Sequence, residues 1–357
     1  MKIKSHFPQT QNQIYLNTAA CGLLSTTVLE QKHKDNSMFF EKGKDFLNNE
    51  EEIVTQTKEN IADIFKASPN RIAITANFSL PFNAVLDAID NSARFLCLTE
   101  DYPSVILPIK SRGFRCDTIS ISENIEHDIY DHIKNHKPDV LALSKVQYLG
   151  GIHLETSFFQ NLKQDFPNLK ILVDATQYLG VEEFDFNDSG IDLMIASGYK
   201  WINAGLGSAI VMMSDALYEE LASPQIGANS LKDKAKSLSK PMGFLEPGHY
   251  DLIAIRSLQT ALDLHYHQIG ISKISKHIKL LSERAFEAFK GRNLLDEKVY
   301  KRNQHSSIFN LNISQDKFQE FEQAHVKLSK RGNGLRVSFH YYNTIDDLKR
   351  FLEFLKA

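Results

Sequence analysis

The sequence predicts an α/β protein, with a mostly parallel, doubly wound sheet in a large domain and a smaller α+β domain at the C-terminal end. Three observations predict this. Short apolar runs alternate with helix-length segments through the first two-thirds of the chain. Most of these runs are apolar at every position, which is typical of strands covered by helices on both faces. After about residue 245, two long helical patterns precede several short strands instead.

Seven apolar runs are the expected strands of the large sheet: 71–75, 94–99, 116–121, 139–144, 170–175, 193–197 and 208–213. Helix-length segments separate most of them, at 79–90, 103–112, 125–135 and 155–165. Crossovers of that length join parallel strands. The last two runs have only a short link, which permits an antiparallel pair.

The C-terminal third has a different pattern, with expected helices at 251–268, 271–291 and 345–356 and expected strands within 306–313, 325–330 and 335–342. The proline and glycine residues of "SKPMGFLEPGHYD" (239–251) mark a linker. We expect a large domain at 21–245, a small domain at 246–357, and an N-terminal segment, 1–20, that packs with the small domain.

Composition narrows the class of protein. The 357 residues carry a formal net charge of -3, and the basic residues are scattered, so no nucleic-acid surface is expected. No run approaches the roughly 18 apolar residues of a membrane helix, and the N-terminus lacks a signal-peptide core. The cysteines, Cys21, Cys97 and Cys116, are odd in number and form no CxxC motif. This cysteine pattern predicts a protein of the reducing cytoplasm, and we expect neither a disulfide nor a metal site.

Two charged residues follow strand ends. Asp174 ends the apolar run of "KILVDATQ", and Lys200 lies between two apolar runs in "LMIASGYKWINAGLGSAIVMM". Ligands of open α/β sheets bind beyond the carboxyl ends of the strands. An aspartate for a pyridinium nitrogen and a lysine for an aldehyde are the groups that pyridoxal phosphate needs. Taken singly, the aspartate is also compatible with a helix N-cap and the lysine with a solvated loop.

The stretch "VDATQYLGVEEFDFNDSGIDLMIASGYKW" resembles the signature of class V aminotransferases, which are fold-type-I pyridoxal phosphate enzymes. The group includes cysteine desulfurases, selenocysteine lyases, kynureninases and isopenicillin N epimerases. The resemblance implies that Asp174 pairs with the pyridine nitrogen, Gln177 bonds the ring oxygen, and Ser197 binds phosphate. It implies that Lys200 carries the cofactor as a Schiff base. Tyr199 replaces the family's usual histidine, and its hydroxyl can reach phosphate.

Two further segments complete the expected cofactor site. "ITANFSLPFNAVLDAI" is a strand, a turn and a helix, the arrangement that directs free amide groups at an anion. Aligned on the family's Gly-Thr-Thr turn, it places the Ser79 hydroxyl and the Phe78 amide at the phosphate; as an alternative, Ser79 is only an N-cap. Tyr102 occupies the position of the desulfurases' ring-stacking histidine, although a tyrosine before proline is also typical of a surface turn.

The resemblance also implies a substrate side. "LRVSFHYYNT" carries the family's R-x-S-x-x-x-Y-N-T motif, in which Arg336 would bind the substrate carboxylate as a bidentate fork. In "YLNTAACG", Ala20 and its neighbour Ala19 would leave room for the substrate. In "VQYLGG", Tyr148 stands where desulfurases have an asparagine that contacts the cofactor oxygen and the substrate. We therefore expect the neighbouring Gln147 to supply the side-chain amide for these contacts.

A partner subunit is implied by the resemblance alone. "EPGHYD" corresponds to the turn that reaches the phosphate of the other subunit, with His249 in place of threonine. We therefore expect a homodimer with its active site at the subunit interface and a small amino-acid substrate. An uninvolved loop histidine is the alternative for His249.

The expected reaction is transamination, narrowly ahead of elimination or epimerisation like that of selenocysteine lyases, kynureninases or isopenicillin N epimerases. All these reactions need a base for the α-proton, and the Lys200 amine would serve. Residues 296–336 contain no cysteine, so persulfide-forming desulfuration by the usual route is not expected. The alternative to an enzyme is a non-catalytic protein that has the same fold.

Overall fold

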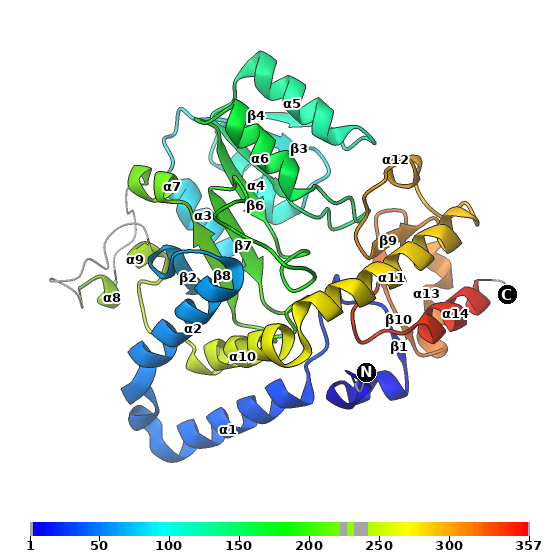
Figure 1. Cartoon of the computed structure of the whole chain (residues 1–357), viewed down its shortest axis with the longest axis horizontal. Coiled ribbons are helices and arrows are strands. Elements are labelled where there is room, and N and C mark those ends of the chain that lie inside the picture. The colour runs from blue at the N-terminus through cyan, green and yellow to red at the C-terminus, as the bar shows by residue number, and fades with distance from the viewer. Residues whose placement is uncertain (1–2, 222–226, 232–241, 356–357) are drawn as a thin grey trace.

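The computed structural model describes residues 3–221, 227–231 and 242–355. Residues 239–241 of the expected linker lie outside these ranges. Figure 1 shows a large sheet with helices on both sides, a long helix α11 (Ile271–Lys290) running away from it, and a smaller group of strands and helices at the far end.

The large sheet has seven strands in the order β2-β8-β7-β6-β5-β3-β4. Their bounds are β2 (Ile72–Thr75), β3 (Arg94–Leu98), β4 (Arg115–Ile119), β5 (Val140–Ser144), β6 (Lys170–Asp174), β7 (Leu193–Ser197) and β8 (Ala209–Met213). The pairs β3–β4, β3–β5, β5–β6 and β6–β7 are parallel. β8 is antiparallel to both β7 and β2, so the short link between the last two strands makes the antiparallel pair that the sequence permitted.

Alternate residues of the central strands enter two separate cores. In β5, Leu141 and Leu143 belong to one apolar cluster, while Val140 and Ala142 belong to the other. Successive side chains of a strand point to opposite faces, so a strand covered on both sides must be apolar throughout. This is the physical reason why the apolar runs predicted the sheet.

Helices cover each face of the sheet (Figure 1). The second cluster, with Val140, takes side chains from α3 (Ser79–Ala88), α4 (Pro103–Ser111) and α7 (Asp215–Glu220). The first takes side chains from α5 (Ile125–His136), α6 (Thr156–Asp165) and three helices described next. Two short helices, α8 (Ala228–Leu231) and α9 (Met242–Leu245), follow β8.

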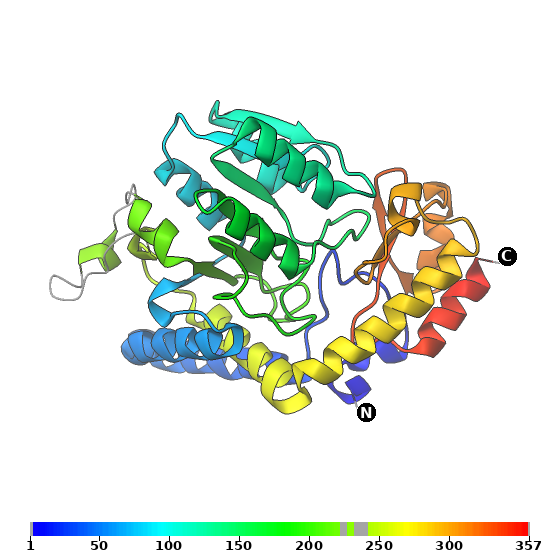
Figure 2. The same ribbon diagram turned by 45° about the horizontal axis from the view of Figure 1, so that its top comes forward.

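Two helices precede the sheet and were not expected from the sequence: α1 (Thr26–Lys42) and α2 (Glu50–Phe65). Figure 2 shows them in blue at the lower left, next to α10 (Leu252–Leu262), which packs on both. The buried Asp35 carboxylate of α1 accepts a hydrogen bond from Arg256 of α10 at 3.2 Å. α10 therefore packs on the large body, although it falls within the range expected for the small domain.

The C-terminal part is built on a three-stranded antiparallel sheet, β11-β12-β9, packed against helices. Its elements are β9 (Ile308–Leu311), β10 (Val326–Lys327), β11 (Ser329–Arg331), β12 (Gly334–Ser338), α12 (Glu297–Tyr300), α13 (Phe318–Gln323) and α14 (Ile345–Phe354). The N-terminal strand β1 (Ile14–Tyr15) pairs with β10 in parallel. The division into 1–20, 21–245 and 246–357 stays a prediction.

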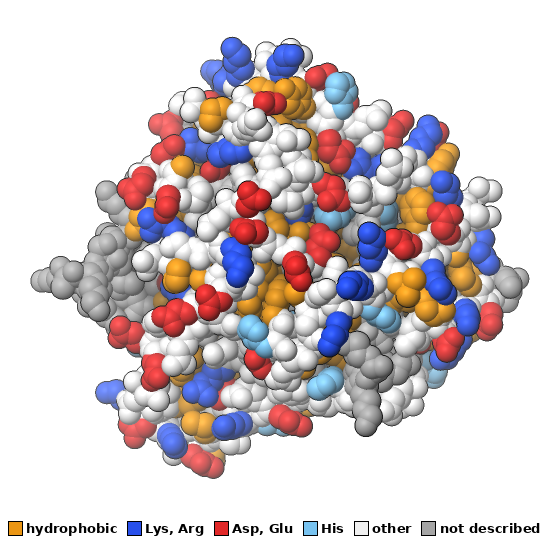
Figure 3. All heavy atoms as spheres, viewed as in Figure 1, with side chains coloured by type: hydrophobic (Ala, Val, Ile, Leu, Met, Phe, Trp, Pro, Cys, Tyr) orange, Lys and Arg blue, Asp and Glu red, His pale blue; other side chains and the backbone are white. Residues whose placement is uncertain are grey.

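The surface mixes charges of both signs. On the face in Figure 3, basic and acidic side chains lie interspersed among polar and apolar ones. Within the described ranges, none of the helices combines the length and the apolar character that crossing a bilayer requires.

Candidate active site

A pocket opens where the parallel strands end. Asp174 is the last residue of β6, Ser197 of β7 and Ser144 of β5, and all three line it. The other lining residues come from the start of α3 and from the loops after the strands: Asn77, Phe78, Ser79, Tyr102, Val146, Tyr148, Thr176, Gln177, Tyr199 and Lys200. Most of the predicted cofactor residues are therefore brought together at the edge of the sheet where such folds bind ligands.

Asp174 is a buried carboxylate at the base of this site. Its side chain accepts a hydrogen bond from the Thr176 amide at 2.8 Å. Burial raises the pKa of Asp174 to about 6, against the opposing effects of that hydrogen bond and of Lys200. A buried carboxylate with one short hydrogen bond is stabilised by a cationic ligand, which a protonated ring nitrogen supplies.

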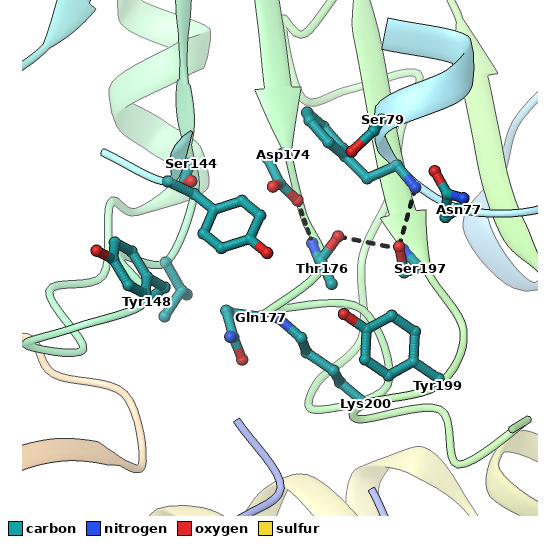
Figure 4. A pocket seen from close by; sticks show the side chains of 13 residues that line it. Asn77, Ser79, Ser144, Tyr148, Asp174, Thr176, Gln177, Ser197, Tyr199 and Lys200 are labelled. Atoms are coloured by element: carbon teal, nitrogen blue, oxygen red, sulfur yellow. Dashed lines mark hydrogen bonds between the residues drawn. The ribbon is translucent and has the colours of Figure 1, made fainter. Parts of the chain in front are cut away.

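Lys200 extends toward Asp174 from the opposite side of the pocket, as Figure 4 shows. The residue is 6% exposed, and burial lowers the pKa of its amine to about 8. The Asp174 charge works against this shift, and the Arg336 charge adds to it. A lysine with a pKa near neutrality has a substantial fraction of free amine, the form that reacts with carbonyl groups.

The loop that carries Lys200 is held by the N-terminal segment. The Gly22 amide donates to the Tyr199 carbonyl at 2.9 Å, and the Asn203 side chain donates to the Leu23 carbonyl at 2.8 Å. A Cβ atom on Gly22 would lie 2.0 Å from the Lys200 carbonyl oxygen. Only glycine permits this close approach, so residue 22 fixes the position of the reactive loop.

Polar groups gather where a phosphate is expected. The Phe78 amide donates to the Ser197 hydroxyl at 3.0 Å, and the Ser197 amide donates to the Thr176 hydroxyl at 3.1 Å (Figure 4). Ser79 begins α3 and shares a hydrogen bond of 3.0 Å with Ser104. The first amides of a ten-residue helix and these hydroxyls form an anion-binding arrangement. Sequence reasoning missed Thr176, the residue between Asp174 and Gln177.

Tyr102 lines the pocket as predicted. Its ring lies 5.5 Å from the Lys200 Nζ and 5.3 Å from the Tyr148 ring, at 69°. The buried Asp101 accepts hydrogen bonds from the Tyr102 amide at 2.7 Å and from the Ser144 hydroxyl at 2.6 Å. Burial raises the pKa of Asp101. Sequence reasoning missed Asp101, which comes three residues after the end of β3, whereas Asp174 is itself the last residue of β6.

Arg336 lies in β12, buried at 2% exposure. Its Nη1 donates to the Tyr148 carbonyl at 2.8 Å, while its Nε has no hydrogen-bond partner among the described residues. Burial, and next the charge of Arg331, lowers the pKa of Arg336 to about 10. A buried guanidinium with a free N–H beside the Lys200 pocket is suited to binding a carboxylate.

None of the three predicted substrate residues, Arg336, Gln147 and Ala20, is among the residues that line the pocket. The Gln147 side chain donates to the Glu100 carbonyl at 3.1 Å and accepts from the Leu149 amide at 2.9 Å. Its amide is used to close its own turn, and Tyr148 faces the pocket instead. Ala20 lies in the adjacent N-terminal segment, whose carbonyl at Ala19 accepts a hydrogen bond from Gln177.

Of the two remaining predicted residues, Tyr199 and His249, only Tyr199 lies at the pocket. Tyr199 lines the pocket, and burial raises the pKa of its hydroxyl to about 12. His249 does not line the pocket: its side chain is 68% exposed, and its Nδ1 lies 3.4 Å from the Glu50 carboxylate. A role for His249 at a partner's site stays a prediction.

The donor set fits pyridoxal phosphate. It has a buried carboxylate for a ring nitrogen, an amine for an aldehyde, an aromatic ring, and a helix start with hydroxyls for a phosphate. The Arg336 Nε is left without a hydrogen-bond partner among the described residues, and its role toward a substrate carboxylate stays a prediction. Fold and site thus define a pyridoxal phosphate-dependent enzyme of fold type I.

Comparison with known proteins gives the family. The model of class V aminotransferases matches residues 14–324, and the chain belongs to that family. A probable cysteine desulfurase of Pyrococcus abyssi is 22% identical, over 99% of this chain and 96% of its own length. A probable cysteine desulfurase of Mycoplasma genitalium is 24% identical, over 85% of this chain and 81% of its own length.

Solved structures agree on the fold. A mutant of C-DES with glycine covalently linked to the PLP cofactor has a TM-score of 0.88 at 18% identity, covering 99% of this chain and 98% of that one. A complex of the cystine C-S lyase C-DES with its product cysteine persulfide has a TM-score of 0.86 at 18% identity, covering 98% of both chains. The apo cysteine desulfurase of Thermococcus onnurineus NA1 has a TM-score of 0.84 at 17% identity, covering 99% and 96%.

Proposed function

We propose that this protein is a pyridoxal phosphate-dependent lyase that cleaves the carbon–sulfur bond of a sulfur-containing amino acid, of which cystine and cysteine are the first candidates. The relatives named above are probable cysteine desulfurases, and a solved structure similar along its full length is a cystine C-S lyase. These likenesses favour the lyase alternative over the aminotransferase that the sequence narrowly favoured.

The observation that carries the proposal is the placement of the cysteines. Residues 296–336 contain none, so the segment that leads into Arg336 carries no thiol. Cys97 and Cys116 lie on β3 and β4, where Cys97 is fully buried. A direct elimination releases the sulfur with the leaving group and needs no protein thiol to accept it. Cys21 is exposed, and its Sγ lies 4.0 Å from the Tyr199 carbonyl oxygen. The absence of a thiol in the segment before Arg336 supports direct elimination, in which Cys21 is dispensable.

The residues divide the work in a way that suits elimination. When bound, the cofactor supplies an electron sink for the charge that develops at the substrate α-carbon. Arg336 would hold the α-carboxylate and so orient the substrate. The Lys200 amine, with its pKa lowered to about 8 by burial, would take the α-proton as a base. The buried Asp174 would keep the ring nitrogen protonated by its charge.

Product identification tests the proposal. We expect the holoenzyme to form pyruvate and ammonium from L-cystine, together with a persulfide, in the absence of any keto acid. L-alanine, which has the same carboxylate and amine but no leaving group, is the matched control and should give no pyruvate. Pyruvate formation from alanine that depends on an added keto acid would instead show an aminotransferase, and loss of substrate chirality alone would show an epimerase.

The proposal extends to the assembly of the protein and its location in the cell. Leu206, six residues after Lys200, is 71% exposed, and Phe40 of α1 is 89% exposed. A homodimer with its active site at the subunit interface, which the family resemblance implies, would cover exposed apolar side chains of this kind. Sedimentation of the holoenzyme tests the dimer. The cytoplasmic location that the unpaired cysteines predict is part of the same proposal.

A further inference from the structure

Trp201 follows Lys200 directly and is the only tryptophan of the chain. It is 1% exposed, and its indole N–H donates to the Gln177 Oε1 at 2.7 Å. The Gln177 Nε2 in turn donates to the Ala19 carbonyl at 2.9 Å. The side-chain amide of Gln177 is thus held at both ends by groups outside the pocket that it lines.

These two bonds fix which way the amide faces. An indole N–H can only donate, and a backbone carbonyl can only accept. The oxygen of Gln177 must therefore face Trp201 and its nitrogen must face Ala19, so the orientation follows from chemistry. One N–H of the Nε2 remains for the pocket. Gln177 can consequently present a hydrogen-bond donor to an oxygen of a bound ligand.

Trp201 itself is held by the segment that follows the Arg336 strand. The His340 Nε2 donates to the Trp201 carbonyl at 2.9 Å, and the two rings stack at 5.2 Å and 21°. The Ser338 hydroxyl accepts from the Ala19 amide at 2.9 Å. Both partners of the Gln177 amide are therefore anchored to the chain directly after Arg336.

We propose that Trp201 is a positioning residue that holds Gln177 in the one orientation in which its amide donates to the cofactor's ring oxygen. The inference rests on the cofactor and on the contact with the ring oxygen that the family resemblance implies for Gln177, and it does not depend on which bond the enzyme cleaves. A donor stabilises the ionised form of that oxygen, so Trp201 lowers the pKa at which the bound cofactor titrates.

The geometry also says what removal of the indole N–H would do. Without it, the Gln177 amide is free to turn and present its oxygen to the pocket. The Gln177 Oε1 would then face the ring oxygen of the cofactor, and the repulsion between them would disfavour the ionised form of the ring oxygen. We expect Trp201→Phe, which retains a ring to stack on His340, to raise the spectral pKa of the bound cofactor by about one unit, the size of one lost hydrogen bond.

The matched control is Tyr341→Phe. Tyr341 is a buried aromatic residue whose hydroxyl lies 3.0 Å from the His265 Nε2, and its loss removes one buried hydrogen bond without touching Gln177. We expect both variants to lose stability and only Trp201→Phe to shift the pH titration of the cofactor's visible spectrum. An unshifted titration in Trp201→Phe, or an equal shift in Tyr341→Phe, overturns the proposal.

A second measurement uses the single indole of the wild-type protein. Because the chain has one tryptophan, its isotope-labelled indole N–H gives one resonance. We expect that resonance to be protected from exchange in the cofactor-free protein, to lose protection in Gln177→Leu, and to shift when pyridoxal phosphate binds. A rapidly exchanging indole, or a resonance indifferent to both changes, overturns the proposal even if Trp201→Phe does not fold. Failure of the lyase assay would leave these readouts unaffected.

Discussion

Asp174 and Lys200 face each other across one buried pocket, and each lies in a charge state that burial opposes. Burial raises the pKa of Asp174 to about 6 and lowers the pKa of Lys200 to about 8. Each residue partly offsets the shift of the other. The cofactor-free pocket is therefore costly to fold, and a ligand that pairs with the carboxylate and reacts with the amine relieves both costs.

Replacing Asp174 should stabilise the cofactor-free protein. Because the pKa of Asp174 is higher in the folded state, the unfolded chain ionises first as pH rises from 3.8. The free energy of unfolding therefore falls between pH 3.8 and about 6, and it stays at this lower value at higher pH. At pH 7.5, Asp174→Asn should raise the free energy of unfolding by about 1–3 kcal/mol, measured in denaturant. In the same variant, pyridoxal phosphate should bind at least about tenfold more weakly, since one favourable charge pair is lost.

Asp192→Asn is the matched control, because Asp192 is also buried but is fully paired. It accepts from Lys163 Nζ at 2.6 Å and from the Ile171 amide at 2.9 Å. This variant should lose stability, since it leaves the half-buried Lys163 ammonium without its carboxylate partner. Equal destabilisation by both substitutions would contradict the view of Asp174 as a carboxylate kept for its ligand.

The lowered pKa of Lys200 predicts a pH dependence. The folded state binds fewer protons than the unfolded state between about pH 8 and 10.5, so Lys200 makes the cofactor-free protein more stable as pH rises through that window. The rate at which the protein captures pyridoxal phosphate should rise toward pH 8 and then level, because only the neutral amine reacts.

Asp174→Asn sharpens this test. The Asp174 charge raises the pKa of Lys200, so its removal should move the midpoint of capture to lower pH. Absorbance growth followed at a series of pH values measures both midpoints. A midpoint that stays above pH 10 in the wild-type protein would show that Lys200 titrates as an exposed lysine.

Ser197 should act on the phosphate end of the cofactor alone. Its hydroxyl accepts from the Phe78 amide at the start of α3. Ser197→Ala should weaken pyridoxal phosphate by about tenfold, the cost of one hydrogen bond to a charged group. Pyridoxal, which lacks the phosphate, is the control ligand, and its affinity should not change. Equal losses for the two ligands would place Ser197 elsewhere in the site.

Arg336 should affect the substrate and leave the cofactor in place. Arg336→Ala removes the guanidinium with the free Nε, so half-saturation by the amino acid should need at least about tenfold more substrate. The visible spectrum of the holoenzyme should persist. Arg292→Ala is the control, because its side chain is exposed, donates to the Ala288 carbonyl at 2.9 Å, and is remote from the Lys200 pocket. Loss of bound cofactor in Arg336→Ala would contradict its assignment.

A protein without cysteines tests whether sulfur passes through the enzyme. We expect the variant Cys21→Ser, Cys97→Ala, Cys116→Ala to form pyruvate from cystine within about twofold of the wild-type rate, since elimination needs no thiol. Cys97→Ala alone is the control for the stability cost of emptying a buried site on β3. Activity that disappears with Cys21 would show a protein persulfide instead.

The sheet could be predicted because its strands are apolar on both faces. Asp174 and Lys200 could be found because charge after such a strand is conspicuous. The helices α1 and α2 were missed: both are polar on much of their surface, and their partner α10 lies about 200 residues further along the chain. Gln147 was preferred to Tyr148 because a turn's hydrogen bonds, which decide which side chain faces outward, leave no periodic pattern.

Partners distant in the chain were out of reach for the same reason. Nothing in the sequence pairs Trp201 with Gln177 or Gln177 with Ala19, because those contacts exist only once the loops after β6 and β7 meet the N-terminal segment. The family resemblance gave the chemistry of the site, and the fold gave its supporting hydrogen bonds.

The most direct test of the central claim is the position at which the cofactor attaches. The holoenzyme is reduced with borohydride and digested, and the modified peptide is sequenced by mass spectrometry. We predict that the cofactor is found on Lys200, in the peptide containing "IASGYKWINAG", and that Lys200→Ala carries none. Cofactor attached to the fully buried Lys145 or to a surface lysine, with Lys200 unmodified, would contradict the account.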